Sequence, residues 1–84
     1  MKYTVRSVAD LGHALRQFRL AKSMTQSDLA QASAAKQNAV SRIETGDAGR
    51  TLKLVFKLIS LLDLEIEIRP RRKGSAQDIE DIFS

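Results

Sequence analysis

The chain has 84 residues, no cysteine, a single histidine and a formal net charge of +4, which arises from 14 lysines and arginines against 10 aspartates and glutamates. This length supports one domain with a thin core, the lack of cysteine excludes a disulfide framework, and His13 alone cannot complete a zinc site. Because no apolar run reaches about 18 residues and residues 1–10 lack the hydrophobic region of a signal peptide, we expect a cytoplasmic protein without a membrane-spanning segment.

The first expected helix runs from Ser7 to Lys22. Ser7 is a favoured N-cap residue, and apolar residues follow it at the three-and-four spacing of an amphipathic helix. The side chains of its expected buried edge are Val8, Leu11, Leu15 and Phe18. His13 falls on another face, so we expect it at the surface rather than in a metal or catalytic site.

A second, shorter helix is expected over residues 26–32, in the stretch MTQSDLA. Thr25 and Asp28 have the spacing of a capping box, and Met24 precedes the cap, where it can pack on Leu29. The following stretch, SAAK, contains neither glycine nor proline, yet the apolar pattern restarts after it. This restart indicates a tight turn between two helices.

The third expected helix begins at Ala35 or Lys36 and ends at Thr45. Its inward-facing residues are Ala39, Val40 and Ile43. Gly46 supplies the left-handed residue that ends the helix. The first turn of this helix, KQN, is polar, in contrast to the apolar residues that follow.

The fourth expected helix spans Leu52 to Leu62, with Thr51 as its cap. It is apolar over much more than one stripe, although one apolar face is enough for a helix in a small bundle. The surplus apolar face, which includes Phe56, is therefore expected to contact a second subunit.

After the fourth helix the spacing of apolar residues changes to two, which predicts a half-buried strand over residues 64–70. One strand in a helical chain needs a partner for its backbone groups, and the candidates are residues 2–5, the same strand of a second copy, or both. The residues assigned to a homodimer interface are Phe56, Leu64, Ile66 and Ile68.

The expected organisation is an N-terminal arm or short strand over residues 1–6, a helical domain over 7–63, a dimerisation strand over 64–70 and a flexible tail over 71–84. The basic cluster RRK at the start of the tail either solubilises it or contacts phosphate groups without specificity. Ile79, Ile82 and Phe83 have helical spacing but no local core. Their segment is either disordered or orders on a protein partner.

The second and third expected helices, with the tight turn between them, form the pattern of a helix-turn-helix. In that motif the second helix points its N-terminus into the major groove of DNA, so its first turn offers donors and acceptors to base edges. The charge agrees with a polyanionic partner, because residues 1–70 contain eleven basic and seven acidic side chains.

The sequence resembles a known family at these positions. TQSDLA followed by QNAVSRIETG is similar to the phage-repressor or xenobiotic-response-element class (XRE, Cro/C1-type) of helix-turn-helix proteins, over residues 7–62. More narrowly, VADLGHALRQFR, AKQNAVSRIE and TLKLVFKLISLLDLEIEI are similar to HipB-type antitoxins, the DNA-binding partners of HipA-type kinase toxins. The resemblance implies a mostly α, lambda-repressor-like bundle of four to five helices with a C-terminal β-strand that pairs across a dimer.

The resemblance also implies roles for individual residues. Those expected to face DNA bases are Lys36, Gln37, Asn38, Ser41 and Arg42. Those expected to contact phosphates are Gln26, Arg50 and Lys53. Arg19 and Glu44 are expected to form a buried structural ion pair, and removing one partner would cost ~3–5 kcal/mol. The turn departs from the family pattern at Ser33 and Ala34, and a positive φ at Ala34 would cost about 1 kcal/mol.

We therefore expect a homodimeric, sequence-specific repressor, the antitoxin of a HipBA-like system that represses its own operon at an inverted repeat in double-stranded DNA. Its expected protein partner is a HipA-like kinase toxin, contacted by Ile79, Ile82 and Phe83. The alternatives are a free-standing XRE-type regulator and an interaction module whose main role is toxin binding. Neither an enzyme nor a cofactor is expected, because the sequence offers no paired carboxylates, nucleophile-base set or glycine-rich phosphate loop.

Overall fold

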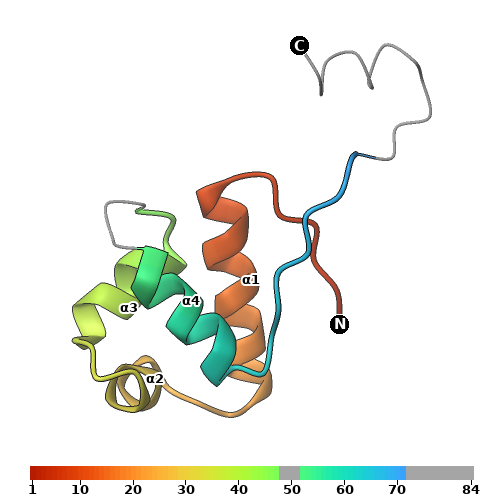
Figure 1. The fold of residues 1–84 in the computed structure, drawn as a ribbon. Helices are drawn as coiled ribbons and strands as arrows, with labels where there is room; N and C mark the ends of the chain where they lie inside the picture. The colour runs from red at the N-terminus through yellow and green to blue at the C-terminus, as the bar shows by residue number, and fades with distance from the viewer. Residues whose placement is uncertain (48–51, 72–84) are drawn as a thin grey trace.

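Four α-helices make up the regular structure of residues 1–47 and 52–71, the parts of the chain that a computed structural model describes (Figure 1). They are α1 (Val8–Ala21), α2 (Gln26–Ala32), α3 (Gln37–Glu44) and α4 (Leu52–Leu61). The four predicted helices are thus confirmed, with small differences at their ends of the kind that fraying produces. None of the described helices is long and apolar enough to cross a membrane.

Side-chain caps fix the starts of α1 and α2. Ser7 Oγ accepts a hydrogen bond from the backbone N–H of Asp10 at 3.0 Å, so the predicted N-cap is confirmed. Before α2, Thr25 and Asp28 each accept a hydrogen bond from the other's backbone N–H at 2.9 Å, which completes the predicted capping box. The backbone hydrogen bond from Thr25 is the main cause that lowers the pKa of Asp28. The stabilisation from this cap is therefore present at neutral pH and is lost as the pH falls through the lowered pKa.

All four described helices end on a residue in the left-handed region. These residues are Ser23 (φ 57°), Ala34 (φ 56°), Gly46 (φ 85°) and Asp63 (φ 59°). At each end the N–H of this residue donates to the carbonyl three residues back, and the next N–H donates five residues back, which is the Schellman pattern. Gly46 has the role expected of it. The other three ends lack glycine, so each carries a conformational cost of about 1 kcal/mol.

Ala34→Gly is expected to stabilise the domain. The positive φ considered for Ala34 from the sequence is present, and the side chain is exposed, so removing its Cβ loses no packing. Glycine should raise the free energy of unfolding by about 0.5–1 kcal/mol, as measured by urea denaturation. The control is Ala32→Gly in the last turn of α2, which should lower that free energy by a similar amount. An Ala34→Gly variant that unfolds at the same urea concentration as the parent would contradict the strain argument.

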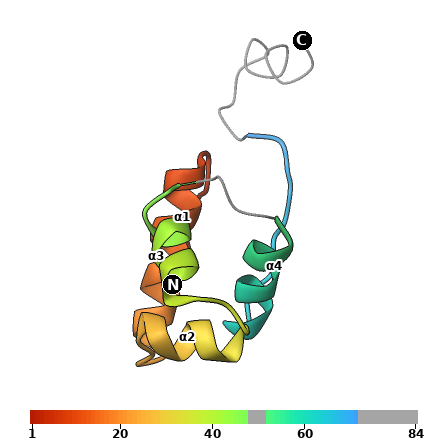
Figure 2. The same cartoon turned by 90° about the vertical axis from the view of Figure 1, so that its left-hand side faces the viewer.

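The core lies between the four helices, and each of them contributes to it. Its buried residues are Leu15, Leu29, Ala30, Val40, Ile43, Val55, Leu58, Ile59 and Leu62. In Figure 2, α1 and α3 lie side by side, α2 runs across the lower end of the bundle, and α4 stands on the other side of the core. The predicted inward edges are correct for Val40, Ile43 and Leu15. Val8 is 43% exposed, contrary to expectation, because it borders an open hollow rather than the closed core.

The backbones of α1 and α3 approach each other closely at Gly12. A Cβ atom on this residue would lie 2.2 Å from the carbonyl oxygen of Ile43 and 2.8 Å from that of Glu44. Both distances are far below contact distance for a carbon and a carbonyl oxygen, so no side chain fits at this position. Gly12 therefore allows the end of α3 to pack directly on α1.

The strand predicted over residues 64–70 is not formed in the single chain, and residues 1–47 and 52–71 contain no β-strand. After α4 the chain runs back along the bundle beside α1 in an extended path and then leaves it (Figure 1). A ladder needs a second strand, and no backbone hydrogen bond joins residues 2–5 to this segment within the described parts of the chain. Ile66 and Ile68 are accordingly 47% and 94% exposed. Leu64, the first apolar residue of this alternation, is instead half-buried against the core.

Ring contacts and one ion pair connect the flanking segments to α1 and to the residue that follows it. Tyr3 of the N-terminal arm makes edge contacts with the rings of His13 and Phe18, at centroid distances of 5.9 and 5.6 Å. Lys22 Nζ donates to Asp63 Oδ2 at 2.8 Å, which links the end of α1 to the end of α4 and lowers the pKa of Asp63. This ion pair is largely exposed, so its contribution to stability is small. His13 lies at the surface, as expected.

Candidate nucleic-acid interface

α3 has one buried side and one exposed polar side. Val40, Ile43 and Glu44 are buried against the rest of the domain. Of the residues predicted to face bases, Lys36, Gln37, Asn38 and Arg42 are exposed and Ser41 is half-buried. None of these five side chains forms a hydrogen bond with another described residue. The structure thus places them together, with their donors and acceptors available to a partner.

The start of α3 has no side-chain cap. Its N-cap residue is Lys36, whose ammonium group has no acceptor atom. The carbonyl of Lys36 accepts hydrogen bonds from the backbone N–H groups of Ala39 and Val40, at 2.9 and 3.3 Å. The backbone N–H groups of Gln37 and Asn38, in contrast, have no acceptor within the described parts of the chain. Two backbone donors therefore stand beside two amide side chains, a combination that suits an acceptor such as a base edge or a phosphate.

A buried carboxylate joins the ends of three helices. Glu44 of α3 accepts from Arg19 of α1 twice, at 2.6 Å from Nε to Oε2 and at 3.0 Å from Nη2 to Oε1. The Arg19 side chain is 6% exposed and that of Glu44 is 1% exposed, so the expected buried ion pair is present. Arg19 Nη1 also donates to the carbonyl of Met24 at 2.7 Å, and Gln26 Nε2 donates to Glu44 Oε1 at 3.1 Å. These bonds satisfy charges that burial would otherwise make costly.

The residues predicted to contact phosphates occupy different elements. Gln26 is half-buried at the first position of α2, and Lys53 is exposed in the first turn of α4. The bond between Gln26 and Glu44 was not foreseen, because it depends on how α2 packs against α3, which the linear spacing of the two residues does not indicate. The predicted residues that lie outside the described parts of the chain are Arg50, Thr51, Arg72, Lys73, Ile79, Ile82 and Phe83.

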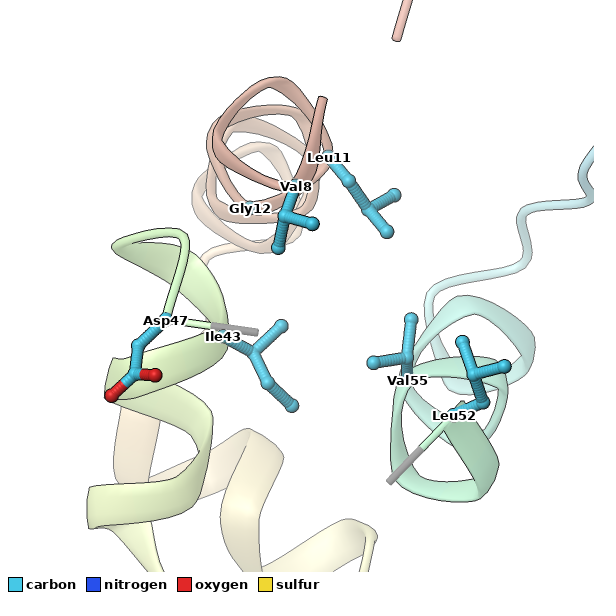
Figure 3. A pocket seen from close by; sticks show the side chains of 7 residues that line it. All are labelled: Val8, Leu11, Gly12, Ile43, Asp47, Leu52 and Val55. Atoms are coloured by element: carbon cyan, nitrogen blue, oxygen red, sulfur yellow. The ribbon is translucent and has the colours of Figure 1, made fainter. Parts of the chain in front are cut away.

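A hollow of about 90 Å³ between α1, α3 and α4 is not suited to a small-molecule ligand (Figure 3). Its lining residues are Val8, Leu11, Gly12, Ile43, Asp47, Leu52 and Val55. Ligand pockets usually have volumes of about 300–1,000 Å³ and several convergent polar groups, whereas among the described residues that line this hollow Asp47 has the one charged side chain. Among the described residues there is also no group of three or more His, Cys, Asp or Glu side chains that could hold a metal ion. The candidate site is the exposed face of α3, because side chains and backbone donors without a partner among the described residues gather there.

A match to a known protein family covers most of the chain. A family described as a helix-turn-helix domain matches residues 10–71, which include α2, α3, α4 and all but the first two residues of α1. No similar sequence is found among curated proteins.

Several solved structures resemble this fold. HipB in a complex with the O4 20mer is 28% identical, covers 81% of this chain and 96% of that chain, and superposes with a TM-score of 0.74. A HipA-HipB-O2-O3 complex contains a chain with 28% identity, the same coverages and a TM-score of 0.73. The restriction-modification controller protein C.AhdI from Aeromonas hydrophila is 33% identical, covers 69% of this chain and 88% of that chain, and gives a TM-score of 0.63.

Proposed function

Because the chain belongs to the helix-turn-helix domain family, we propose that it is a sequence-specific DNA-binding repressor that inserts the start of α3 into the major groove. The observation that carries this proposal is the exposed polar face of α3. It combines unbonded amide and cationic side chains with a capless helix start, on a helix that Val40 and Ile43 hold rigidly in the core. A rigid helix with free donors and acceptors is what reading base edges requires.

We assign base contacts to side chains of α3 and phosphate contacts to side chains of other segments. The amides of Gln37 and Asn38 suit the N6 and N7 atoms of adenine, and Lys36 suits the O6 and N7 atoms of guanine. Ser41 and Arg42 would extend the base contacts by one turn. Gln26, Arg50 and Lys53 would bind phosphates, which fixes the register of the protein without reading sequence.

A homodimer would complete both the fold and the DNA site. Phe56, 52% exposed in α4, would form the interface with the exposed residues Ile66 and Ile68 and with Leu64, which is half-buried against the core. Pairing the segment 64–70 with its copy would supply the strand partner that the described residues of one chain do not provide. Dimers of this motif contact half-sites one helical turn, ~34 Å, apart or a multiple of it, so the operator should be an inverted repeat.

The biological role that the comparisons favour is that of an antitoxin. Similarity at 28% identity to HipB and to a chain of the HipA-HipB-O2-O3 complex supports a HipBA-like system in which this chain binds a HipA-like kinase toxin and represses its own operon. A second candidate is a free-standing regulator, which the 33% identity to the controller protein C.AhdI supports. Isolating a kinase from cells that express the tagged chain favours the first. DNA binding with no co-purified kinase favours the second.

The antitoxin proposal assigns toxin binding to Ile79, Ile82 and Phe83. Truncating the chain after Pro70 should then abolish capture of the toxin and rescue from its toxicity, while a chain with the three residues replaced by serine should behave like the truncation. Full rescue by the truncated chain would remove the tail from any neutralising role.

Base reading and phosphate binding are separated by two substitutions. Gln37→Ala should cost roughly 1–3 kcal/mol on the operator and relax specificity at one base position. Lys53→Ala should weaken binding to all sequences alike and reduce the salt dependence of log K by about one unit. Fluorescence anisotropy on the operator, its single-base variants and unrelated DNA measures both effects. Failure of footprinting to find a protected inverted repeat upstream of the gene would refute autoregulation.

A further inference from the structure

Glu44 accepts a hydrogen bond from Gln26 in addition to the two that it accepts from Arg19. Arg19 already donates to both carboxylate oxygens of Glu44, at 2.6 and 3.0 Å. The third bond, 3.1 Å from Gln26 Nε2 to Glu44 Oε1, connects this buried pair to a side chain that is half-exposed at the edge of α2. The pair is thereby linked to the surface next to α3.

The carboxylate determines which way the Gln26 amide points. An ionised carboxylate only accepts hydrogen bonds, so Glu44 binds the amino group of the amide and repels its carbonyl oxygen. The amide cannot flip without exchanging an attractive contact for a repulsive one. One Nε2 hydrogen is used by Glu44, and the second stays available as a donor in a fixed direction. A glutamine without this contact would present its carbonyl oxygen as readily as its amino group.

Arg19 removes the charge that would otherwise oppose an anion at Gln26. Its guanidinium is paired with Glu44 in the buried network, and the two charges cancel. An oxygen of DNA near Gln26 therefore approaches a neutral pair rather than a bare carboxylate. The network as a whole offers a donor and no net negative charge.

We infer that Glu44 is a positioning residue for Gln26, holding its amide so that the second Nε2 hydrogen is donated to a phosphate oxygen of bound DNA. The inference rests on the proposed function, since it presupposes that this chain binds DNA. A phosphate oxygen is an acceptor only, so the contact requires the amide orientation that Glu44 imposes. Glu44 itself does not touch the DNA in this scheme.

A double-mutant cycle tests the inference. Gln26→Ala is measured in the parent chain and in a chain in which Arg19→Met and Glu44→Leu together replace the ion pair by apolar side chains of similar size, a change that folds commonly tolerate. In the parent, Gln26→Ala should weaken DNA binding about tenfold or more, as expected for a hydrogen bond to a charged group. In the apolar background the same substitution should change affinity by less than about twofold, because Gln26 is no longer held.

Gln37→Ala is the matched control for this cycle. Gln37 makes no contact with Glu44 in the described chain, so its substitution should weaken binding equally in both backgrounds. Equal losses for Gln26→Ala in both backgrounds would show that Glu44 is only structural. No loss in either background would show that Gln26 does not contact DNA. Absence of DNA binding by the parent chain would instead refute the proposed function.

Nuclear magnetic resonance of the parent protein gives a second test that needs no variant to fold. In the free protein, one side-chain N–H of Gln26 should exchange with water more slowly than the side-chain N–H groups of Gln37. On adding operator DNA the other Gln26 proton should shift and become protected. Rapid exchange of both Gln26 protons in the free protein would overturn the positioning role, whether or not the chain binds DNA.

Discussion

Gly12→Ala is expected to destabilise the domain by about 2–3 kcal/mol, although alanine is the better helix former. The new Cβ would lie 2.2 Å from the carbonyl oxygen of Ile43 and 2.8 Å from that of Glu44. Both atoms belong to the backbone of α3, which cannot rotate away as a flexible side chain does. Relief requires α1 and α3 to separate, and separation loosens the core packing of Val40 and Ile43 on α1.

Urea denaturation followed by circular dichroism measures this effect. The control is Arg16→Ala, an exposed position one turn further along α1, which should change the free energy of unfolding by less than about 0.5 kcal/mol. DNA binding by the Gly12→Ala variant should also weaken, because the orientation of α3 depends on how this helix packs against α1. A variant more stable than the parent, as helix propensity alone predicts, would contradict the close approach of the two helices.

Local features of this fold are readable from the sequence, because their causes lie within a few residues. Ser7, Thr25 and Asp28 cap their helices as their spacing predicts, and Gly46 ends α3 in the left-handed conformation. The same motif at Ser23 and Asp63 escapes prediction. Neither residue is a glycine, the residue type that usually occupies this position, so the sequence does not indicate these two helix ends.

Non-local features required either a resemblance or the structure. Gly12 in the middle of a helix gives no sign that it faces a backbone more than thirty residues later. The pairing of Arg19 with Glu44 was expected only from the family pattern. The strand over residues 64–70 was predicted from its alternation, which is a property of one chain, whereas a strand exists only with a partner.

The polar face of α3 was predicted because the helix starts with Lys36, Gln37 and Asn38, whereas most helices start with a simple N-cap residue. A cap at Lys36 would have satisfied the first backbone N–H groups within the protein, and its absence leaves those of Gln37 and Asn38 to a partner. The geometry of the turn before it, including the positive φ of Ala34, is what the sequence left open.

Breaking the Arg19–Glu44 pair on one side is expected to be among the most destabilising single changes in the described chain. Arg19→Met leaves the Glu44 carboxylate buried with the neutral Gln26 amide as its remaining side-chain donor, and Glu44→Leu leaves a buried guanidinium bonded to the carbonyl of Met24. Each should cost ~3–5 kcal/mol, because an uncompensated charge is kept out of water. The two changes together should cost far less than their sum, since no charge is then left unpaired.

Thermal and urea unfolding of the two single variants and the double variant measures this coupling. The coupling free energy should show that the two side chains stabilise each other, because each is more than nine-tenths buried and each charge has the other as its counter-ion. Lys22→Met provides the comparison, since its ion pair with Asp63 is largely exposed and should contribute at most about 1 kcal/mol. If the losses of the two single variants simply add in the double variant, the charges of Arg19 and Glu44 do not interact energetically. That result would also refute the inference that Glu44 holds Gln26 in place within a neutral network.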